Sequence, residues 1–161
     1  MQQDRSLILV ICTGNTCRSP MAEKLLQHAL AAEDEPLSCL SVESAGVAAI
    51  HDEPPSAHSI SALKRINIDL TPHKSQPVTQ ELIDSAFMIL GMTDSHLDIL
   101  KHSYTQNLPK HINLFRGFME PGNATQIPDP FGRDFEAYRE CLDTMVEAIP
   151  SLIAYLKKEY K

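Results

Sequence analysis

The chain has 161 residues, of which 43% are hydrophobic and 22% are charged, and its formal net charge is −7. This is the size of one ordinary domain with a sizeable core, so we expect a single domain over residues 1–161. The acidic balance argues against nucleic acid as a partner, because phosphate backbones bind basic surfaces. The sequence has no run of about 18 apolar residues, so we expect no membrane-spanning helix and no membrane partner.

Hydrophobic patterns and helix-start signals predict four strands that alternate with helices. Residues Leu7–Ile11 are apolar without a break, which is typical of a strand covered on both faces. We expect Ser19 to cap the next helix with Pro20 in its first turn, and Pro150 to kink or divide the last helix. In chain order the sequence predicts strand 7–11, helix 19–33, strand 39–46, helix 56–66, short helix 79–85, strand 86–92, helix 93–104, strand 111–115, loop 116–132 and helix 134–160.

This alternation of strands and helices predicts a parallel α/β sheet with right-handed crossovers. Ligands of such sheets bind beyond the carboxyl ends of the strands, beside the starts of the helices. The segment Cys12–Ser19 lies between the first predicted strand and the first predicted helix. It is therefore the first place to look for a binding site.

The four cysteines are Cys12, Cys17, Cys39 and Cys141. A chain of this length needs no disulfide framework, and no pair of C-x2-C motifs is present to hold zinc. We therefore expect a reducing, cytoplasmic setting and no metal site. We expect Cys39 and Cys141 to be plain core or helix residues.

The loop reads C-T-G-N-T-C-R-S from Cys12 to Ser19. Gly14 and Asn15 tolerate left-handed backbone, so successive N–H groups can converge and bind a phosphate-like anion at the helix start. Arg18 adds a planar fork of donors for two anion oxygens. We expect these positive groups to acidify the thiol of Cys12, with the Ser19 hydroxyl donating to its sulfur. The thiolate would then attack a bound phosphoryl group in line.

The C-x5-R pattern alone is weak evidence, because it also occurs by chance and Cys12 could be an ordinary buried cysteine. Its place after a buried strand and before a Ser-Pro helix start favours catalysis. Phosphoryl transfer from a poor leaving group also needs an acid. The candidate is Asp129, which "IPDPFG" holds between two prolines in a loop at the same sheet edge; an ordinary Asp-Pro turn is the alternative.

With these residues the chain resembles the low-molecular-weight protein tyrosine phosphatase family. The matching segments are "VICTGNTCRSPMAE", "SAG" at Ser44–Gly46, "LTPH" at Leu70–His73, "MTDSHLDIL" at Met92–Leu100 and "IPDPFG". The resemblance implies a single-domain, four-stranded parallel sheet with helices on both faces, a Rossmann-like three-layer fold.

The same resemblance implies the reaction. Cys12 would be the nucleophile that forms a cysteinyl-phosphate, Arg18 would bind the phosphate and the transition state, and Asp129 would act first as acid and then as base. The substrates would be phosphorylated proteins and the product inorganic phosphate. No metal and no cofactor are implied.

The resemblance also implies roles for residues around the nucleophile. Asn15 would hold the shape of the loop through contacts that involve Ser44 and His73. A reversible disulfide between Cys12 and Cys17 would shield the nucleophile from over-oxidation, whereas the simpler reading of Cys17 is a small residue at the back of the loop. The expected phosphate-binding loop comprises Thr13, Gly14, Asn15, Thr16, Cys17 and Ser19.

Two positions bear on the choice of substrate. Tyrosine-directed members of the family carry Ile where this chain has Thr16, and the chain is similar to the protein arginine phosphatase branch, which carries Thr. A hydroxyl accepts a hydrogen bond from a guanidinium, whereas Ile would desolvate its N–H groups without a partner. Phe131 supplies one aromatic wall for a guanidinium, and Gly132 follows where tyrosine-directed members usually have a second ring. Protein phosphoarginine is the favoured substrate and phosphotyrosine the alternative.

Two other classes of function are disfavoured. Thiol-dependent arsenate reductases among the relatives need two further cysteines in the region that matches 84–96 here, and that stretch has none. A phosphate-binding module without catalysis would be expected to lack Cys12, Arg18 or Asp129, and all three are present.

Overall fold

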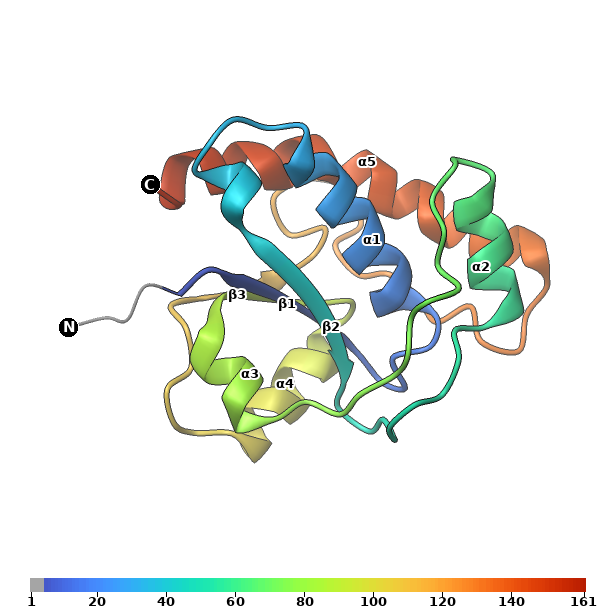
Figure 1. Ribbon diagram of the computed structural model, residues 1–161, viewed down its shortest axis with the longest axis horizontal. Helices are drawn as coiled ribbons and strands as arrows, with labels where there is room; N and C mark the ends of the chain where they lie inside the picture. Colours follow the sequence, from blue (N-terminus) through green and yellow to red (C-terminus); the bar gives the residue numbers. More distant parts are fainter. Residues whose placement is uncertain (1–4) are drawn as a thin grey trace.

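The computed structural model describes residues 5–161, and its strands form one sheet. All four strands are parallel, in the order β2-β1-β3-β4 (Figure 1). The four-stranded parallel sheet expected from the sequence is therefore confirmed; residues 1–4 of the expected domain lie outside the described part. The elements are β1 Leu7–Cys12, α1 Arg18–Ala31, the 3₁₀ helix η1 Leu37–Cys39, β2 Ser41–Gly46, α2 Ala57–Lys64, α3 Gln80–Ser85, β3 Ala86–Gly91, α4 Asp94–Ser103, β4 His111–Leu114 and α5 Phe135–Glu159.

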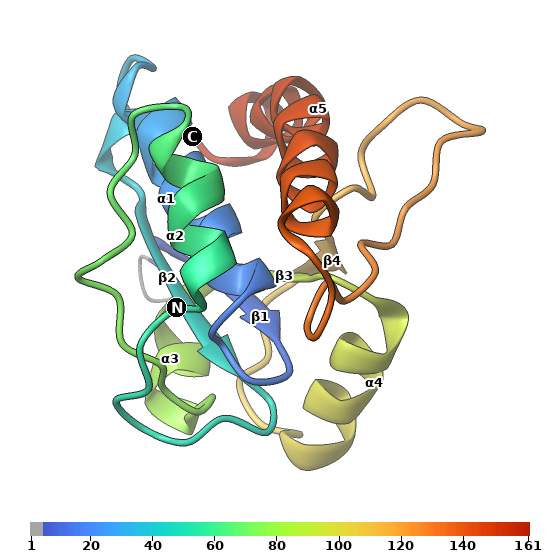
Figure 2. The ribbon, with the colours of Figure 1, turned by 90° about the vertical axis from the view of Figure 1, so that its right-hand side faces the viewer.

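Alternate residues of the central strand face two different layers of helices. Ile8 and Val10 of β1 pack in the core cluster that contains α1 and α5, whereas Leu9 and Ile11 pack in the cluster that contains α3 and α4. Figures 1 and 2 show α1, α2 and α5 on one side of the sheet and α3 and α4 on the other. Successive strand residues point to opposite faces, so a strand covered on both sides needs the unbroken apolar run seen in the sequence.

Side-chain caps explain where most of the helices begin. Ser56, Thr79 and Asp134 each accept a hydrogen bond from the backbone N–H three residues further on, at the starts of α2, α3 and α5. At the start of α4, Thr93 and His96 form a reciprocal capping box. These short polar residues satisfy N–H groups that have no partner within the helix.

The start of the first helix differs from the expectation. Helix α1 begins at Arg18, with Cys17 as its N-cap and no side-chain capping bond, so the expected N-cap role of Ser19 is wrong. The hydroxyl of Ser19 lies 2.9 Å from the sulfur of Cys12 and accepts a hydrogen bond from the Asn15 side chain instead. This hydroxyl is bound within the loop after β1, and the N-cap lies two residues earlier than expected.

The second strand is shorter than predicted. The sequence predicts a strand over 39–46, but Leu37–Cys39 form a 3₁₀ turn and β2 begins at Ser41. The turn buries Leu37 and leaves Cys39 exposed, so Cys39 is not a core residue. Cys141 is buried on α5, as expected.

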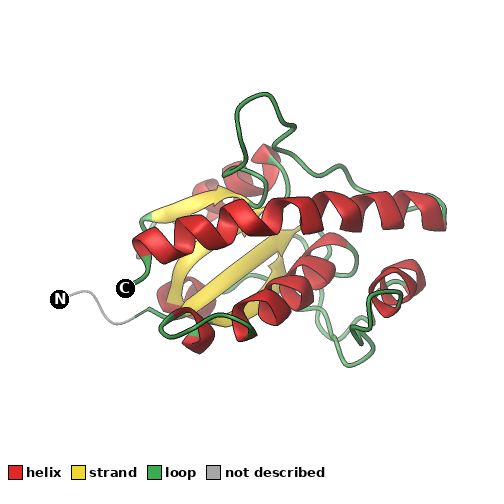
Figure 3. Ribbon diagram, turned by 90° about the horizontal axis from the view of Figure 1, so that it is seen from above, coloured by secondary structure: helices red, strands yellow, loops and turns green. Residues whose placement is uncertain are grey.

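Helix α5 runs undivided through Pro150, as Figure 3 shows, so of the two expected effects of this proline, a kink or a division, the division does not occur. A proline inside a helix removes the hydrogen bond to the carbonyl four residues earlier, here that of Val146. Val146 is 45% exposed, and this side of the helix faces solvent. Water can therefore replace the missing donor. None of the helices within residues 5–161 combines the length and the apolar character that a bilayer-spanning segment needs.

Candidate active site

The loop after β1 curls around the sulfur of Cys12 at the carboxyl end of the sheet. Cys12 is the last residue of β1 and is 3% exposed. The backbone N–H of Asn15 donates to its Sγ at 3.3 Å, and the Ser19 Oγ lies 2.9 Å from the same atom. Asn15 has a φ of 58°, so Asn15 and not Gly14 supplies the left-handed residue that closes the loop.

The side chain of Asn15 is the central brace of this loop. It is fully buried, and its amide group donates to the hydroxyls of Ser19 at 2.8 Å and Ser44 at 2.9 Å. Its Oδ1 accepts the backbone N–H of Gln76, and its backbone carbonyl accepts from His73 Nε2 at 2.8 Å. The structure therefore brings Ser44 and His73 to the loop, and it adds Gln76, which no sequence pattern singled out.

Gly46, at the end of β2, lets the loop pack closely against the neighbouring strand. A Cβ at this position would lie 2.6 Å from the Ala49 Cβ and would overlap the backbone carbonyl oxygen of Thr13. Because this close neighbour is backbone, a side chain could fit only if the loop moved. The segment Ser44–Gly46 thus supplies both a hydrogen bond to the loop and the space that the loop occupies.

The guanidinium of Arg18 is buried and points toward the loop before α5. Its side chain is 5% exposed, and Nη1 donates to the backbone carbonyl of Ile127 at 2.9 Å. Nη2 lies 3.6 Å from Asp129 Oδ2 and 3.4 Å from His96 Nε2. Figure 2 shows the segment after β1 close to the segment that leads into α5. Residues more than a hundred positions apart in the sequence therefore meet at one site.

The loop that carries Asp129 is attached to the end of the sheet by its backbone. The Ile127 N–H donates to the carbonyl of Met92 at 2.8 Å, directly after β3. The carboxylate of Asp129 is half exposed, and its Oδ1 accepts the N–H of Phe131 at 3.0 Å. The ring of Phe131 is 74% exposed. The two readings of Asp129, an Asp-Pro turn and a candidate acid, are therefore compatible. The turn holds the carboxylate near the guanidinium of Arg18.

The expected acidification of Cys12 is not what the structure gives. Burial raises the pKa of the Cys12 thiol above its ordinary value. The hydroxyl and the backbone N–H of Ser19, the charge of Arg18 and the N–H of Asn15 all oppose this shift without cancelling it. The positive groups around the sulfur favour the thiolate, but they do not offset the cost of burying its charge.

The hydroxyl of Ser19 is the strongest of the groups that favour the thiolate. Replacing Ser19 with Ala is therefore expected to raise the pKa of the Cys12 thiol further. Its alkylation by iodoacetamide would then begin at a higher pH, since the thiolate is the reactive form. The measurement is the pH dependence of alkylation by mass spectrometry, with fragment ions that separate Cys12 from Cys17. Ser151→Ala on α5 is the control, and an equal pH profile in Ser19→Ala and wild type would contradict the assignment.

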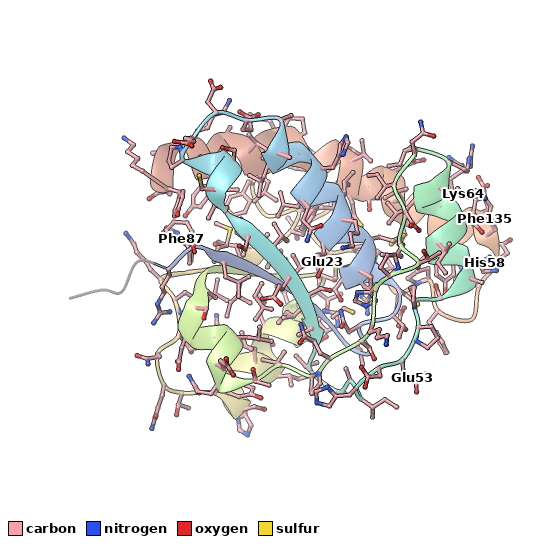
Figure 4. The ribbon with its side chains drawn as sticks, in the orientation of Figure 1. Glu23, Glu53, His58, Lys64, Phe87 and Phe135 are labelled. Atoms are coloured by element: carbon pink, nitrogen blue, oxygen red, sulfur yellow. The ribbon has the colours of Figure 1, made fainter. Side chains whose placement is uncertain are left out.

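Cys17 forms part of the back wall of the loop. Its buried thiol lies 3.4 Å from the hydroxyl of Tyr138 and 3.8 Å from that of Thr16. Burial and the contact with Cys17 raise the pKa of Tyr138 to about 12, so the phenol keeps its proton. Tyr138 packs on His58 at the contact of α2 with α5, where Figure 4 labels His58 and Phe135 side by side. Sequence reasoning missed Tyr138, which lies 121 positions beyond Cys17.

His96, like Gln76 and Tyr138, is a site residue that no sequence pattern singled out. It is 2% exposed, and its Nε2 lies 3.0 Å from Thr13 Oγ1. Burial and the charge of Arg18 lower the pKa of His96 to about 4, although Asp129 opposes them. The ring is therefore neutral at neutral pH.

The site brings together a sulfur, a buried guanidinium and a carboxylate, which are the types of group that phosphoryl transfer by a thiolate needs. Within residues 5–161, no three or more His, Cys, Asp or Glu side chains gather in an arrangement that could hold a metal ion.

Comparison with known proteins gives a consistent match over almost the whole chain. The family model "Low molecular weight phosphotyrosine protein phosphatase" matches residues 7–161. A protein-arginine-phosphatase of Bacillus subtilis is 37% identical over 152 residues, which are 94% of this chain and 97% of the relative.

Solved structures agree with this match. The YwlE arginine phosphatase variant with a phosphorylated active-site serine is 32% identical, with a TM-score of 0.83 over 96% of this chain and 97% of that one. The low-molecular-weight protein tyrosine phosphatase of T. tengcongensis is 31% identical, with a TM-score of 0.82 over 93% of this chain and 99% of that one. The chain therefore belongs to the low-molecular-weight phosphotyrosine protein phosphatase family.

Proposed function

We propose that the protein is an arginine phosphatase, which hydrolyses phosphoarginine in proteins through a cysteinyl-phosphate intermediate. The observation that carries the choice of substrate is the hydroxyl of Thr16 on the wall of the loop. Thr16 is half-buried, and among residues 5–161 its only side-chain neighbour in hydrogen-bonding range is the weak partner Cys17 Sγ at 3.8 Å. The Thr16 oxygen is thus free to accept an N–H of a bound guanidinium.

The first step transfers the phosphoryl group to the protein. The phosphoryl oxygens bind the loop N–H groups and the guanidinium of Arg18, and the thiolate of Cys12 attacks phosphorus. The P–N bond to the substrate breaks as the S–P bond forms. Asp129 gives its proton to the leaving nitrogen, so an unmodified arginine side chain departs.

The second step releases the phosphate. The carboxylate of Asp129 takes a proton from a water molecule, which attacks phosphorus as the S–P bond breaks. Inorganic phosphate leaves and Cys12 returns as a thiolate. The position of the carboxylate supports this double role, because it lies 3.6 Å from the guanidinium that holds the phosphoryl oxygens and is open to water.

The ring of Phe131 and the carboxylate of Asp129, at the mouth of the loop, suit the flat, cationic guanidinium of a phosphoarginine substrate. The ring of Phe131 is 74% exposed and can stack on a guanidinium, which gains from both the face of the ring and the nearby carboxylate of Asp129. The B. subtilis relative is named a protein-arginine-phosphatase, which agrees with this assignment. A phenol would also fit against Phe131, so phosphotyrosine is the second candidate.

Thr16→Ile tests the choice between the two substrates. We expect wild-type protein to prefer a phosphoarginine peptide over the same peptide with phosphotyrosine, measured as the ratio of kcat/KM values. The variant should lower that ratio by about tenfold or more, because an N–H that loses its acceptor in a desolvated site costs about 1–3 kcal/mol. Thr16→Ser, which keeps the hydroxyl, is the matched control. A wild-type preference for phosphotyrosine would make the second candidate correct.

The remaining expectations belong to the same proposal. The chain would act as a single phosphatase domain in the cytoplasm, on phosphorylated proteins, without a metal, a cofactor, a nucleic acid or a membrane. A reversible Cys12–Cys17 disulfide would protect the nucleophile. Both cysteines are free thiols here, and each is buried in the loop that would bring them together.

A further inference from the structure

Thr13, the residue directly after the nucleophile, carries a second hydroxyl at the mouth of the loop. Thr13 is exposed, whereas Cys12, Asn15 and Arg18 of the same loop are buried. Its Oγ1 is held by one side chain, His96, whose Nε2 lies at 3.0 Å. The loop therefore presents an exposed threonine whose hydroxyl is held by a buried histidine.

His96 can hold this hydroxyl because its ring is fixed by the start of α4. Its Nδ1 lies 3.2 Å from the backbone nitrogen of Thr93 and 3.2 Å from the Thr93 hydroxyl. The ring is 2% exposed, and its Nε2 also touches Arg18 Nη2 at 3.4 Å. Arg18 in turn lies 3.6 Å from Asp129. This series of contacts places the Thr13 hydroxyl on the side of the site where the candidate acid and the anion-binding fork lie.

Acceptor capacity remains at Thr13 after its contact with His96. The backbone N–H of Thr93 donates to Nδ1 of His96, so the neutral ring carries its proton on Nε2 and donates to Thr13 Oγ1. One lone pair of the hydroxyl is left, and it can accept an N–H from a bound substrate.

We propose that Thr13 is a second specificity-determining residue, which accepts an N–H of the phosphoarginine guanidinium, and that His96 is the positioning residue that fixes its hydroxyl. This inference rests on the proposed arginine phosphatase function. Thr13 and Thr16 then supply two acceptors to a group that carries several donors. A phenyl ring has no N–H to offer, so the hydroxyl of Thr13 stabilises one substrate and contributes little to the other.

The buried ring of His96 pre-organises the hydroxyl of the exposed Thr13 for substrate binding. A free threonine side chain rotates between staggered rotamers and loses that freedom when it binds. The contact with His96 restrains the hydroxyl before the substrate arrives. A histidine in the ordinary capping box of α4 would need only its Nδ1, so the capping role alone does not use the Nε2 contact with the loop.

The test measures kcat/KM for one peptide with phosphoarginine and the same peptide with phosphotyrosine. Thr13→Val is expected to lower the ratio of the two values by about tenfold or more, as for the loss of a hydrogen bond to a charged donor. Thr13→Ser, which keeps the hydroxyl, should retain the ratio to within about threefold. Thr144→Val on α5 is the matched control outside the site.

His96 is tested by two variants that separate its contacts. His96→Asn keeps a short polar acceptor for the start of α4 but does not reach Thr13, whereas His96→Gln keeps the reach. The ratio should fall in His96→Asn and recover in His96→Gln. The double variant with Thr13→Val should lower the ratio no further than Thr13→Val alone. Melting temperatures of all variants show whether a loss reflects unfolding.

Different results would contradict the proposed function, the role of Thr13 and the role of His96. A wild-type preference for phosphotyrosine would overturn the proposed function and this inference with it. A wild-type preference for phosphoarginine that Thr13→Val leaves intact would overturn this inference alone. Independent, multiplying effects of His96→Asn and Thr13→Val would remove His96 as the residue that acts through Thr13.

Discussion

Arg18→Lys is expected to lower kcat/KM by about a thousandfold, although the positive charge is kept. The guanidinium donates to the carbonyl of Ile127 with one arm and faces Asp129 and the site with the other. An ammonium has no planar fork, so it cannot hold the backbone of the acid loop and two phosphoryl oxygens together. The measurement is kcat/KM on the phosphoarginine peptide, together with the melting temperature.

Arg139→Lys is the matched control for this change. Arg139 lies on the outer face of α5, where it pairs with Glu136 and Asp143 at the surface. Exposed pairs of this kind contribute little to stability, so activity and melting temperature should stay close to those of wild type. A loss smaller than about tenfold in a folded Arg18→Lys variant would remove the bidentate role from Arg18.

Asp129→Asn should lower kcat on poor leaving groups by about 10²–10⁴-fold, the usual contribution of a general acid. The amide keeps the size of the side chain and an oxygen for the N–H of Phe131, but it has no proton to give at the reacting atom. The loss should therefore depend on the leaving group. A substrate such as p-nitrophenyl phosphate, whose leaving group departs without protonation, should lose less in the first step.

The control for this second change is Asp143→Asn, which removes an exposed carboxylate on α5 that pairs with Arg139. Rapid-mixing experiments separate the two proposed roles of Asp129. Release of the first product reports the acid step, and steady-state turnover reports the later attack of water. Equal losses for good and poor leaving groups in the first step would show that Asp129 does not protonate the leaving atom.

Local patterns in the sequence were sufficient where neighbouring residues decide the outcome. The alternation of apolar runs and helical segments predicted the parallel sheet, because each strand must be covered on both faces. The caps of α2, α3 and α5 are side chains that bond to backbone three residues away. Such signals fail where the shape of a loop gives the capping hydroxyl another partner. Ser19 is the example, because its hydroxyl contacts Cys12 and Asn15 of the same loop instead of capping α1.

Cys12, Arg18 and Asp129 could be named as candidates from the sequence, since their residue types and settings are unusual in themselves. Gln76, His96 and Tyr138 could not, because each is an ordinary residue in an ordinary helix or loop until the fold brings it to the site. The predicted lowering of the Cys12 pKa was wrong for a related reason. Its direction depends on how completely the sulfur is buried, which only the packing of the whole domain sets.

Sequence patterns were therefore enough to predict the order of the elements, the loop around Cys12 and the types of group available for phosphoryl transfer. The folded chain was needed to show that the backbone of Ile127 holds Arg18, that Asp129 lies 3.6 Å from that guanidinium and that His96 contacts the hydroxyl of Thr13. The difference follows from the separation along the chain of the residues that interact. Strand and helix signals act between residues a few positions apart, whereas the side-chain contacts beyond the carboxyl ends of the strands join Thr13 to His96, 83 positions away, and Arg18 to Ile127, 109 positions away.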